Sequence, residues 1–451
     1  MSDATLRTRI ATRSVAGTWT PFLYVGVLFA VAGLALFFMK AFGADEAEAA
    51  RAWHLFHVNW LFFTGLAGGS VALAAVHRTV YAKWSGVIVR FAEAASAFLP
   101  FSIIGLILIF TAGYDHIYGP MEHQLHGLAH GKALWLSYGW MFPRLLISLL
   151  ALTFMAYKFV WNNMKGDFAD AAQVATGERK ARYERWSAGY DEASTTHRLH
   201  YIAPGYLVVY ALAFTFVAFD GIMALQPHWF SNLLGGFYFM GSFLGAHTLL
   251  ALTMMYGTKH LGVDDLVSPK QRHDLGKLCF GFTVFWAYLM WAQFLVIWYG
   301  NMPEETGFVF ARLWGHWMPV GRAVLLGMFI IPFVGLLGVA PKKFPVTLGI
   351  FTTISLSALW LERYLLVVPS ITTADGPMFG VVELAPTLGL LGCFLLAYAL
   401  FARTFPMVSP RLALAALVAE RTHGHGHEFG HEETSKDYAM PSELDRREKH
   451  R

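Results

Sequence analysis

The chain has 451 residues, of which 56% are hydrophobic and only 14% are charged, and its formal net charge is +4. Soluble domains usually carry about a quarter charged residues, so this composition excludes an ordinary soluble protein. Only two cysteines occur, Cys279 and Cys393, which excludes an iron–sulfur site, a cysteine-based zinc site and a CxxCH haem attachment. The small positive charge is explained by membrane topology, and no nucleic acid is expected as a partner.

Ten apolar runs follow one another along the chain, each long enough to cross about 30 Å of hydrocarbon as a helix. They cover residues 21–42, 54–77, 94–114, 134–157, 202–224, 232–257, 278–299, 318–340, 345–368 and 382–402. None shows the short alternating pattern of a membrane β-barrel. The sequence therefore predicts an all-α polytopic membrane protein with ten transmembrane helices.

The distribution of basic residues predicts the orientation of these spans. Most of the 34 Lys and Arg residues precede the first span, follow the tenth, or lie in the loops that join an even-numbered span to the next; the opposite loops hold Lys40, Arg51, Lys132 and Arg312. The positive-inside rule makes the first set cytoplasmic, together with both termini. The first apolar run is too long for a signal peptide and is followed by further spans, so we expect it to be uncleaved. The predicted location is a bacterial inner (cytoplasmic) membrane.

A faint internal repeat relates the fourth and eighth spans. Trp140-Met141, Pro143 and Arg144 open the fourth span, while Trp317-Met318, Pro319 and Arg322 open the eighth. Spans two and six each contain a stretch of small residues, at 65–70 and 241–246, which allows helices to approach closely. Four helices return the chain to the same side, so the repeat predicts two four-helix bundles, spans 2–5 and 6–9, related by an axis along the membrane normal. A chance match of the two segments is the alternative.

The predicted organisation follows from these spans. It comprises a cytoplasmic N-terminus (1–20), the first span with its outer loop (21–53), the first bundle (54–224), the second bundle (225–368), the tenth span (369–404) and a cytoplasmic polar tail (405–451). The charged residues 163–198 predict a surface helix and loop. The tail contains His423, His425, His427 and His431, which indicate either weak binding of a divalent metal or, as we favour, a solvated tail without a metal role.

Charged residues inside spans are candidates for function, because each costs about 2.5–3.5 kcal/mol at the bilayer centre. The basic ones are Arg144, Arg322 and Arg363, and the acidic ones are Asp220 and Glu362, with Glu93 and Glu383 nearer the span ends. Counting along each span places the two central acids and the three arginines in the outer half of the membrane. We predict Asp220 and Glu362 as members of a proton path or quinone contact. For the three arginines we favour structural ion pairing.

Histidines and one loop acid extend this predicted proton path or quinone contact. His57 lies at the outer start of span two, His228 follows span five, Asp115 begins the outer loop before span four, and His247 is the only histidine near the centre of a span. A b-type haem needs two histidines at matched depth on facing helices, and His247 has no obvious partner. Without a phosphate-binding loop, nucleophile motif or metalloprotease signature, we expect no catalytic residue, no metal site and no bound redox cofactor.

Residues 219–231, which read F-D-G-I-M-A-L-Q-P-H-W-F-S, add a family resemblance. They are similar to the D-x-x-M-x-L-x-P-H-W-F-S segment in the F subunit of bacterial alternative complex III, a quinol:cytochrome c oxidoreductase. That subunit belongs with the NrfD and polysulfide-reductase membrane subunits. The segment is fairly specific, and the spans, the repeat and the basic loops extend the resemblance over most of the chain. Asp220 and His228 match the segment, whereas the His-rich tail has no counterpart.

The resemblance implies two four-helix bundles with flanking helices, in a complex with a sister NrfD-like subunit, an iron–sulfur subunit and c-type cytochrome subunits. A terminal oxidase is a further candidate partner. Quinol oxidation is usually assigned to the sister subunit in such complexes, and the F subunit is described as a second quinone-binding subunit and a proposed proton conduit. Haem c and the iron–sulfur clusters would then lie in partner subunits, and quinol or menaquinol would be the ligand that this chain contacts.

Our leading hypothesis is a membrane subunit of a quinol-oxidising respiratory complex that holds no cofactor and contacts lipid, quinone and partner subunits. A secondary transporter is the first alternative, because parallel repeats and buried charges also occur in transporters. However, the prolines lie mainly at span starts and not at the midplane, for example Pro21, Pro143, Pro319 and Pro345. A purely scaffolding subunit, with every charge structural, is the second alternative.

Overall fold

The computed structural model describes residues 3–17, 19–372 and 374–424, and this part of the chain is built from helices with no β-strand. Ten helical stretches in it are long and apolar enough to cross a membrane. The prediction of an all-α, polytopic membrane protein with ten spans is therefore confirmed.

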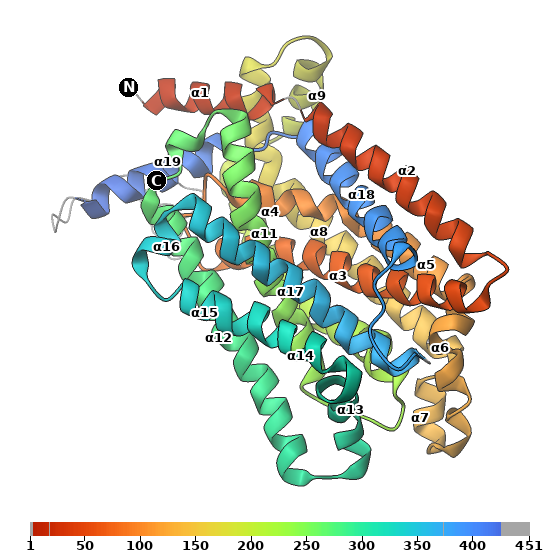
Figure 1. The fold of residues 1–451 in the computed structure, drawn as a ribbon. Helices are drawn as coiled ribbons and strands as arrows, with labels where there is room; N and C mark the ends of the chain where they lie inside the picture. The colour runs from red at the N-terminus through yellow and green to blue at the C-terminus, as the bar shows by residue number, and fades with distance from the viewer. Residues whose placement is uncertain (1–2, 18, 373, 425–451) are drawn as a thin grey trace.

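The spanning helices cross the molecule side by side, and shorter helices lie at its two ends (Figure 1). The spans are α2 (Thr20–Ala41), α3 (Glu46–Thr79), α4 (Val89–Glu93) with η1 (Ala94–Phe98) and α5 (Leu99–Thr111), α8 (Tyr138–Val174), α10 (Glu192–Gly221), α11 (Leu234–Leu261), α12 (Pro269–Gly300), α14 (Met318–Leu325) with η6 (Leu326–Ile330) and α15 (Ile331–Gly335), α17 (Pro345–Ile371) and α18 (Val381–Thr404). The shorter helices are α1 (Asp3–Ala16), α6 (Tyr114–Glu122), α7 (His130–Trp135), α9 (Gly177–Ser187), α13 (Pro303–Leu313), α16 (Val339–Lys343) and α19 (Pro410–Gly424), with single turns η2 (Leu125–Gly127), η3 (Met223–Leu225), η4 (Asp264–Leu266) and η5 (Gly315–Trp317).

Helix α3 lies at the centre of the molecule. Its residues 52–75 are all buried, and it packs against α5, α10, α11, α17 and α18. Close approach to α11 depends on glycine, because a Cβ atom at Gly69 would lie 2.5 Å from the carbonyl oxygen of Ser242. The small residues of span two therefore have the packing role that the sequence suggested.

The contacts between spans link two groups of helices. Helices α3, α5, α8 and α10 form one packed group, and α11, α12, α14, α15 and α17 form the other. The two groups meet where α3 and α10 lie against α11 and where α3 lies against α17. Outside these groups, α2 and α18 lie against each other along their length (Figure 1). A Cβ atom at Gly33 of α2 would lie 2.2 Å from the backbone nitrogen of Gly389. The relation of the two groups by a parallel repeat stays a prediction.

One end of the molecule carries the basic loops, and we call it the basic face. It contains α1, α9 and α19, which lie at the same end in Figure 1. Arg7 of α1 pairs with Asp170 at the end of α8, at 3.0 Å, and Arg9 pairs with Asp265 in the loop before α12, also at 3.0 Å. We call the other end, with α6, α7 and α13, the opposite face. Assignment of the basic face to the cytoplasm stays a prediction.

The segment between spans four and five differs from the prediction of a surface helix and loop over residues 163–198. Helix α8 continues to Val174 and α10 already begins at Glu192, so that only α9 is a separate surface helix. Asp167 and Asp170 are buried, because α1 and α19 pack on the end of α8. The prediction is therefore wrong for residues 163–174, where the two acids are covered by other helices and not by water.

The eighth span is irregular in its middle. It passes through a π-helical turn at Leu326–Ile330, which ends two residues before Pro332. Proline lacks an amide donor and its ring clashes with the carbonyl group four residues earlier, which favours a local widening of the helix. The wider turn follows Leu325, which lines the cavity described next.

Candidate functional site

A cavity of about 570 Å³ lies between α12, α13, α14 and α17, in the half of the molecule nearer the opposite face. Its walls are mainly aromatic and aliphatic, and they include Trp286, Phe308 and Leu325. Gln293, Arg312, Arg322 and Glu362 are its strongly polar lining residues. An apolar cavity of this size with a few convergent polar groups is typical of a site for a small organic ligand.

Glu362 is the acidic residue of the cavity and is only 3% exposed. The guanidinium of Arg363 donates from Nη1 to its Oε2 atom at 2.7 Å, and the indole N–H of Trp286 donates to Oε1 at 3.5 Å. Arg363 is itself held over the Tyr238 ring, 4.3 Å from the centroid, and donates to the Tyr238 carbonyl at 3.2 Å. Because Oε1 accepts only one long hydrogen bond, this oxygen can still accept a proton or hydrogen bond from a ligand.

Arg312 is the buried cation of the cavity, and it has no carboxylate partner among the described residues. It is 4% exposed and lies 3.4 Å above the centroid of the Phe308 ring. Its hydrogen bonds go to the carbonyl groups of Phe308 (2.9 Å) and Leu366 (2.7 Å) and to Oγ of Ser370 (2.5 Å), while its buried Nε has no partner in this part of the chain.

Burial of Arg312 lowers its pKa to about 9, so the guanidinium remains mainly charged at neutral pH. A buried cation without a counter-charge is unfavourable, and an electron-rich ligand oxygen would compensate it through a charge-assisted hydrogen bond. Arg312 is not among the predicted site residues, because it falls in a loop between two predicted spans. The apolar run Phe308-Val309-Phe310 just before it is the one signal of burial in the sequence.

Arg322 requires a correction. It was predicted to form a structural ion pair, but its side chain is exposed and has no ion-pair or hydrogen-bond partner in the residues that the structure describes. The acid nearest to its helix in the cavity, Glu362, is already bound to Arg363, the next residue of α17. Arg322 instead contributes a positive charge to the cavity lining.

Asp220 does not line this cavity and lies instead where α8 meets the end of α10. Both of its carboxylate oxygens accept hydrogen bonds from Arg144, at 2.8 Å from Nε and 2.6 Å from Nη2. Asp220 is fully buried, and the guanidinium lies 3.8 Å from the centroid of the Trp135 ring. This bidentate pair joins α8 to α10 and occupies both oxygens of the acid.

His57 and Tyr118 bind the backbone beside Asp220. His57 Nε2 donates to the Gly221 carbonyl at 2.7 Å, and the Tyr118 hydroxyl donates to the Asp220 carbonyl at 3.1 Å. Burial raises the pKa of Tyr118 well above its usual value, so this hydroxyl stays a donor. These contacts satisfy carbonyl groups left without partners at the end of α10. His57 Nδ1 is buried and has no partner in the part of the chain that is described.

The remaining predicted site residues lie elsewhere. Asp115 and His228 are exposed in segments at the opposite face. His247 is buried in α11, where its Nδ1 bonds to the Phe243 carbonyl at 2.8 Å and its ring packs on Phe282. None of the three lines the cavity beside Glu362. The structure thus brings His57 next to Asp220 but separates them from Glu362, so the predicted residues do not form one continuous site.

A buried ionic cluster near the basic face was not predicted. Arg90 forms ion pairs with Glu93 and Asp167, and all three side chains are fully buried. Asn163 donates to Glu93 at 2.5 Å, and the Ser409 hydroxyl donates to Asp167 at 2.6 Å. Buried charges are therefore not confined to the half of the molecule where the two central acids and the three arginines were predicted. Arg90 and Asp167 lie outside the predicted apolar runs, but the structure includes them in α4 and α8, and the segment that leads into α19 covers them.

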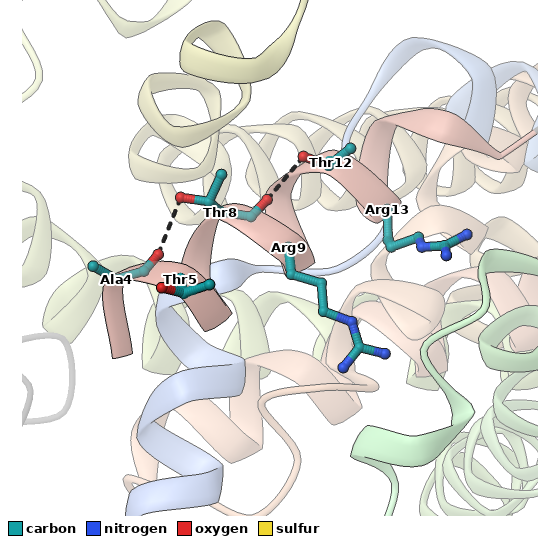
Figure 2. Close-up of a pocket in the computed structure, with 6 residues that line it drawn as sticks. All are labelled: Ala4, Thr5, Thr8, Arg9, Thr12 and Arg13. Carbon is teal, nitrogen blue, oxygen red and sulfur yellow. Dashed lines mark hydrogen bonds between the residues drawn. The ribbon is translucent and has the colours of Figure 1, made fainter. Parts of the chain in front are cut away.

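A surface hollow along α1 carries no comparable argument for binding. Figure 2 shows its lining residues, which all come from this one helix and are exposed: Ala4, Thr5, Thr8, Arg9, Thr12 and Arg13. The hydroxyls of Thr8 and Thr12 donate to backbone carbonyls within the helix, at 3.0 and 2.9 Å. These groups are therefore used in local hydrogen bonds.

Metal ligands are not brought together in the described residues, where no three His, Cys, Asp or Glu side chains form a group that could hold an ion. Of the tail histidines, His425, His427, His431 and the side chain of His423 lie outside the described residues. No protein-family model matches the chain, and a search of curated proteins finds no match either.

Proposed function

We propose that this membrane protein is the quinol-contacting, proton-accepting subunit of a respiratory complex that resembles alternative complex III. The cavity beside Glu362 and Arg312 carries the proposal. A quinol combines an apolar tail with a ring that bears two hydroxyl groups. The cavity combines apolar walls with one acid, Glu362, and a buried cation, Arg312, that has no carboxylate partner among the described residues.

The two polar residues suit the two ring oxygens of a quinol. Glu362 Oε1 can accept the proton of one hydroxyl group, while Arg312 can donate a hydrogen bond to the other ring oxygen and so orient the ring. The proton of that second hydroxyl group would pass to water. The two electrons released on oxidation would pass to iron–sulfur or haem centres in partner subunits, as the family resemblance implies. Asp220 binds Arg144 with both oxygens, so we assign proton acceptance to Glu362 alone.

Access from the bilayer favours a lipid-soluble ligand over a water-soluble transport substrate. Several residues that line the cavity are also exposed on the outside of the molecule, among them Trp291 at 54% and Leu325 at 39%. A quinone dissolved in the membrane could therefore enter sideways between α12 and α14. We further propose that the protein lies in a bacterial cytoplasmic membrane with the basic face inside.

A cavity-filling variant tests the proposal. In Leu325→Trp the indole ring should occupy part of the cavity. In the control variant Leu337→Trp, the same ring replaces a side chain that is 61% exposed and does not line the cavity. After purification with a short-tailed naphthoquinone, we expect retained quinone to fall at least about tenfold in Leu325→Trp only, which corresponds to about 1.4 kcal/mol. Equal retention in both variants would contradict the site.

Purification also separates the alternative functions. A respiratory subunit should co-purify with haem and iron–sulfur proteins in fixed proportion, while a secondary transporter should be isolated alone and colourless. A scaffold should co-purify with these proteins yet bind no quinone.

A further inference from the structure

A groove of about 780 Å³ runs between α11 and α17 near the basic face, away from the cavity described above. Its walls are formed mainly by apolar side chains, among them Leu252, Met255, Ile350 and Ile354. At its bottom the two helices nearly touch, since a Cβ atom at Gly349 would lie 2.5 Å from Cε of Met255.

The length of the groove corresponds to one leaflet of a bilayer. Its α17 wall extends from Pro345 to Ile354, which is about 14 Å of helix at 1.5 Å per residue. One leaflet provides about half of the 30 Å of hydrocarbon in a membrane. An acyl chain that lies in the groove would therefore stay beside its walls over nearly the whole leaflet.

The end of the groove at the basic face is polar and carries more positive than negative charge. Lys259 is exposed there in the last turn of α11 and has no ion-pair partner in the described part of the chain. Arg272 donates from Nε to the Lys343 carbonyl at 2.9 Å and from Nη1 to the Val267 carbonyl at 2.7 Å, which fixes its guanidinium at the rim. Against these two cations the groove lining contains one carboxylate, Asp264.

We propose that this groove binds one anionic phospholipid of the leaflet at the basic face. An acyl chain lies between α11 and α17, and the phosphate lies at Lys259 and Arg272. The apolar walls select a lipid over free phosphate, and the surplus of positive charge selects an anionic head group over a zwitterionic one. The site is independent of the quinol cavity, so either can exist without the other.

Native mass spectrometry of the protein from nanodiscs with equal phosphatidylglycerol and phosphatidylcholine tests this site. We expect one tightly retained phosphatidylglycerol per chain. Lys259→Gln should weaken its retention about fivefold, because one basic residue near a membrane surface contributes about 1 kcal/mol. Lys259→Arg should restore retention, and Arg198→Gln, which removes an exposed charge outside the groove, should leave it unchanged.

A second variant separates the groove from general attraction to the basic face. Ile350→Trp fills the groove at a position that is 53% exposed, so it should abolish the retained lipid without unfolding the protein. Equal retention of the two lipids in the wild type, or full retention in Lys259→Gln or Ile350→Trp, would overturn the proposal. Retention of a peptide chain in place of a lipid would also overturn it.

Discussion

Arg90→Leu is expected to lower the free energy of unfolding by about 3–5 kcal/mol, because it leaves two buried carboxylates without their shared cation. Arg90, Glu93 and Asp167 are all fully buried. Asp167 would keep Ser409 and Arg411 as partners, while Glu93 would keep only the amide of Asn163. Reversible unfolding in lipid–detergent micelles measures the change.

Two further variants show whether the cause is the unpaired charge. Arg9→Leu removes an arginine whose ion pair with Asp265 is exposed, and it should cost less than about 1 kcal/mol. The double variant Arg90→Leu/Glu93→Leu removes cation and acid together, so it should be more stable than Arg90→Leu alone. If the double variant were the less stable of the two, packing and not charge would explain the loss.

Glu362→Gln is expected to slow quinol oxidation by the assembled complex by about 100-fold or more, the contribution typical of a positioned proton acceptor. The amide keeps the shape of the side chain and a hydrogen-bonding oxygen for Arg363, so the complex should assemble normally. The rate is measured with a soluble quinol analogue in membranes that contain equal amounts of the complex.

Glu383→Gln is the matched control for this variant. Glu383 is also a buried glutamate in an ion pair, at 2.6 Å from Arg51, but it does not line the cavity. The Glu383→Gln complex should therefore retain most of the wild-type rate of quinol oxidation. Equal rates in the two variants, whether both high or both low, would remove Glu362 as the proton acceptor.

The spans could be predicted from sequence because their signal is local: an apolar run of sufficient length must form a helix in lipid. Pairing between spans is not local. Arg144 and Asp220 were both singled out as buried charges, but they are 76 residues apart, and no periodicity in the sequence relates them. Only the packing of α8 on α10 brings them together.

The buried charges that the sequence did not predict share one physical cause. A hydropathy pattern places a charge near the end of a span in water, whereas in the structure neighbouring helices can cover that charge. Arg312 is a residue of α13, and its guanidinium is enclosed by Phe308 of the same helix and by α17. Asp167 is covered by the segment that leads into α19. Neither α13 nor α19 is apolar enough to be recognised as part of the membrane domain, so the cavity cation and the buried ionic cluster depend on contacts that the sequence does not display.

The most direct test of the proposed function is an experimental density map of the purified protein, in its complex, with a quinol analogue added. The account predicts a ring in the cavity between α12, α13, α14 and α17, with one oxygen hydrogen-bonded to Arg312 and the other facing Glu362. A cavity that holds only a lipid chain, while the analogue binds on another subunit, would contradict it.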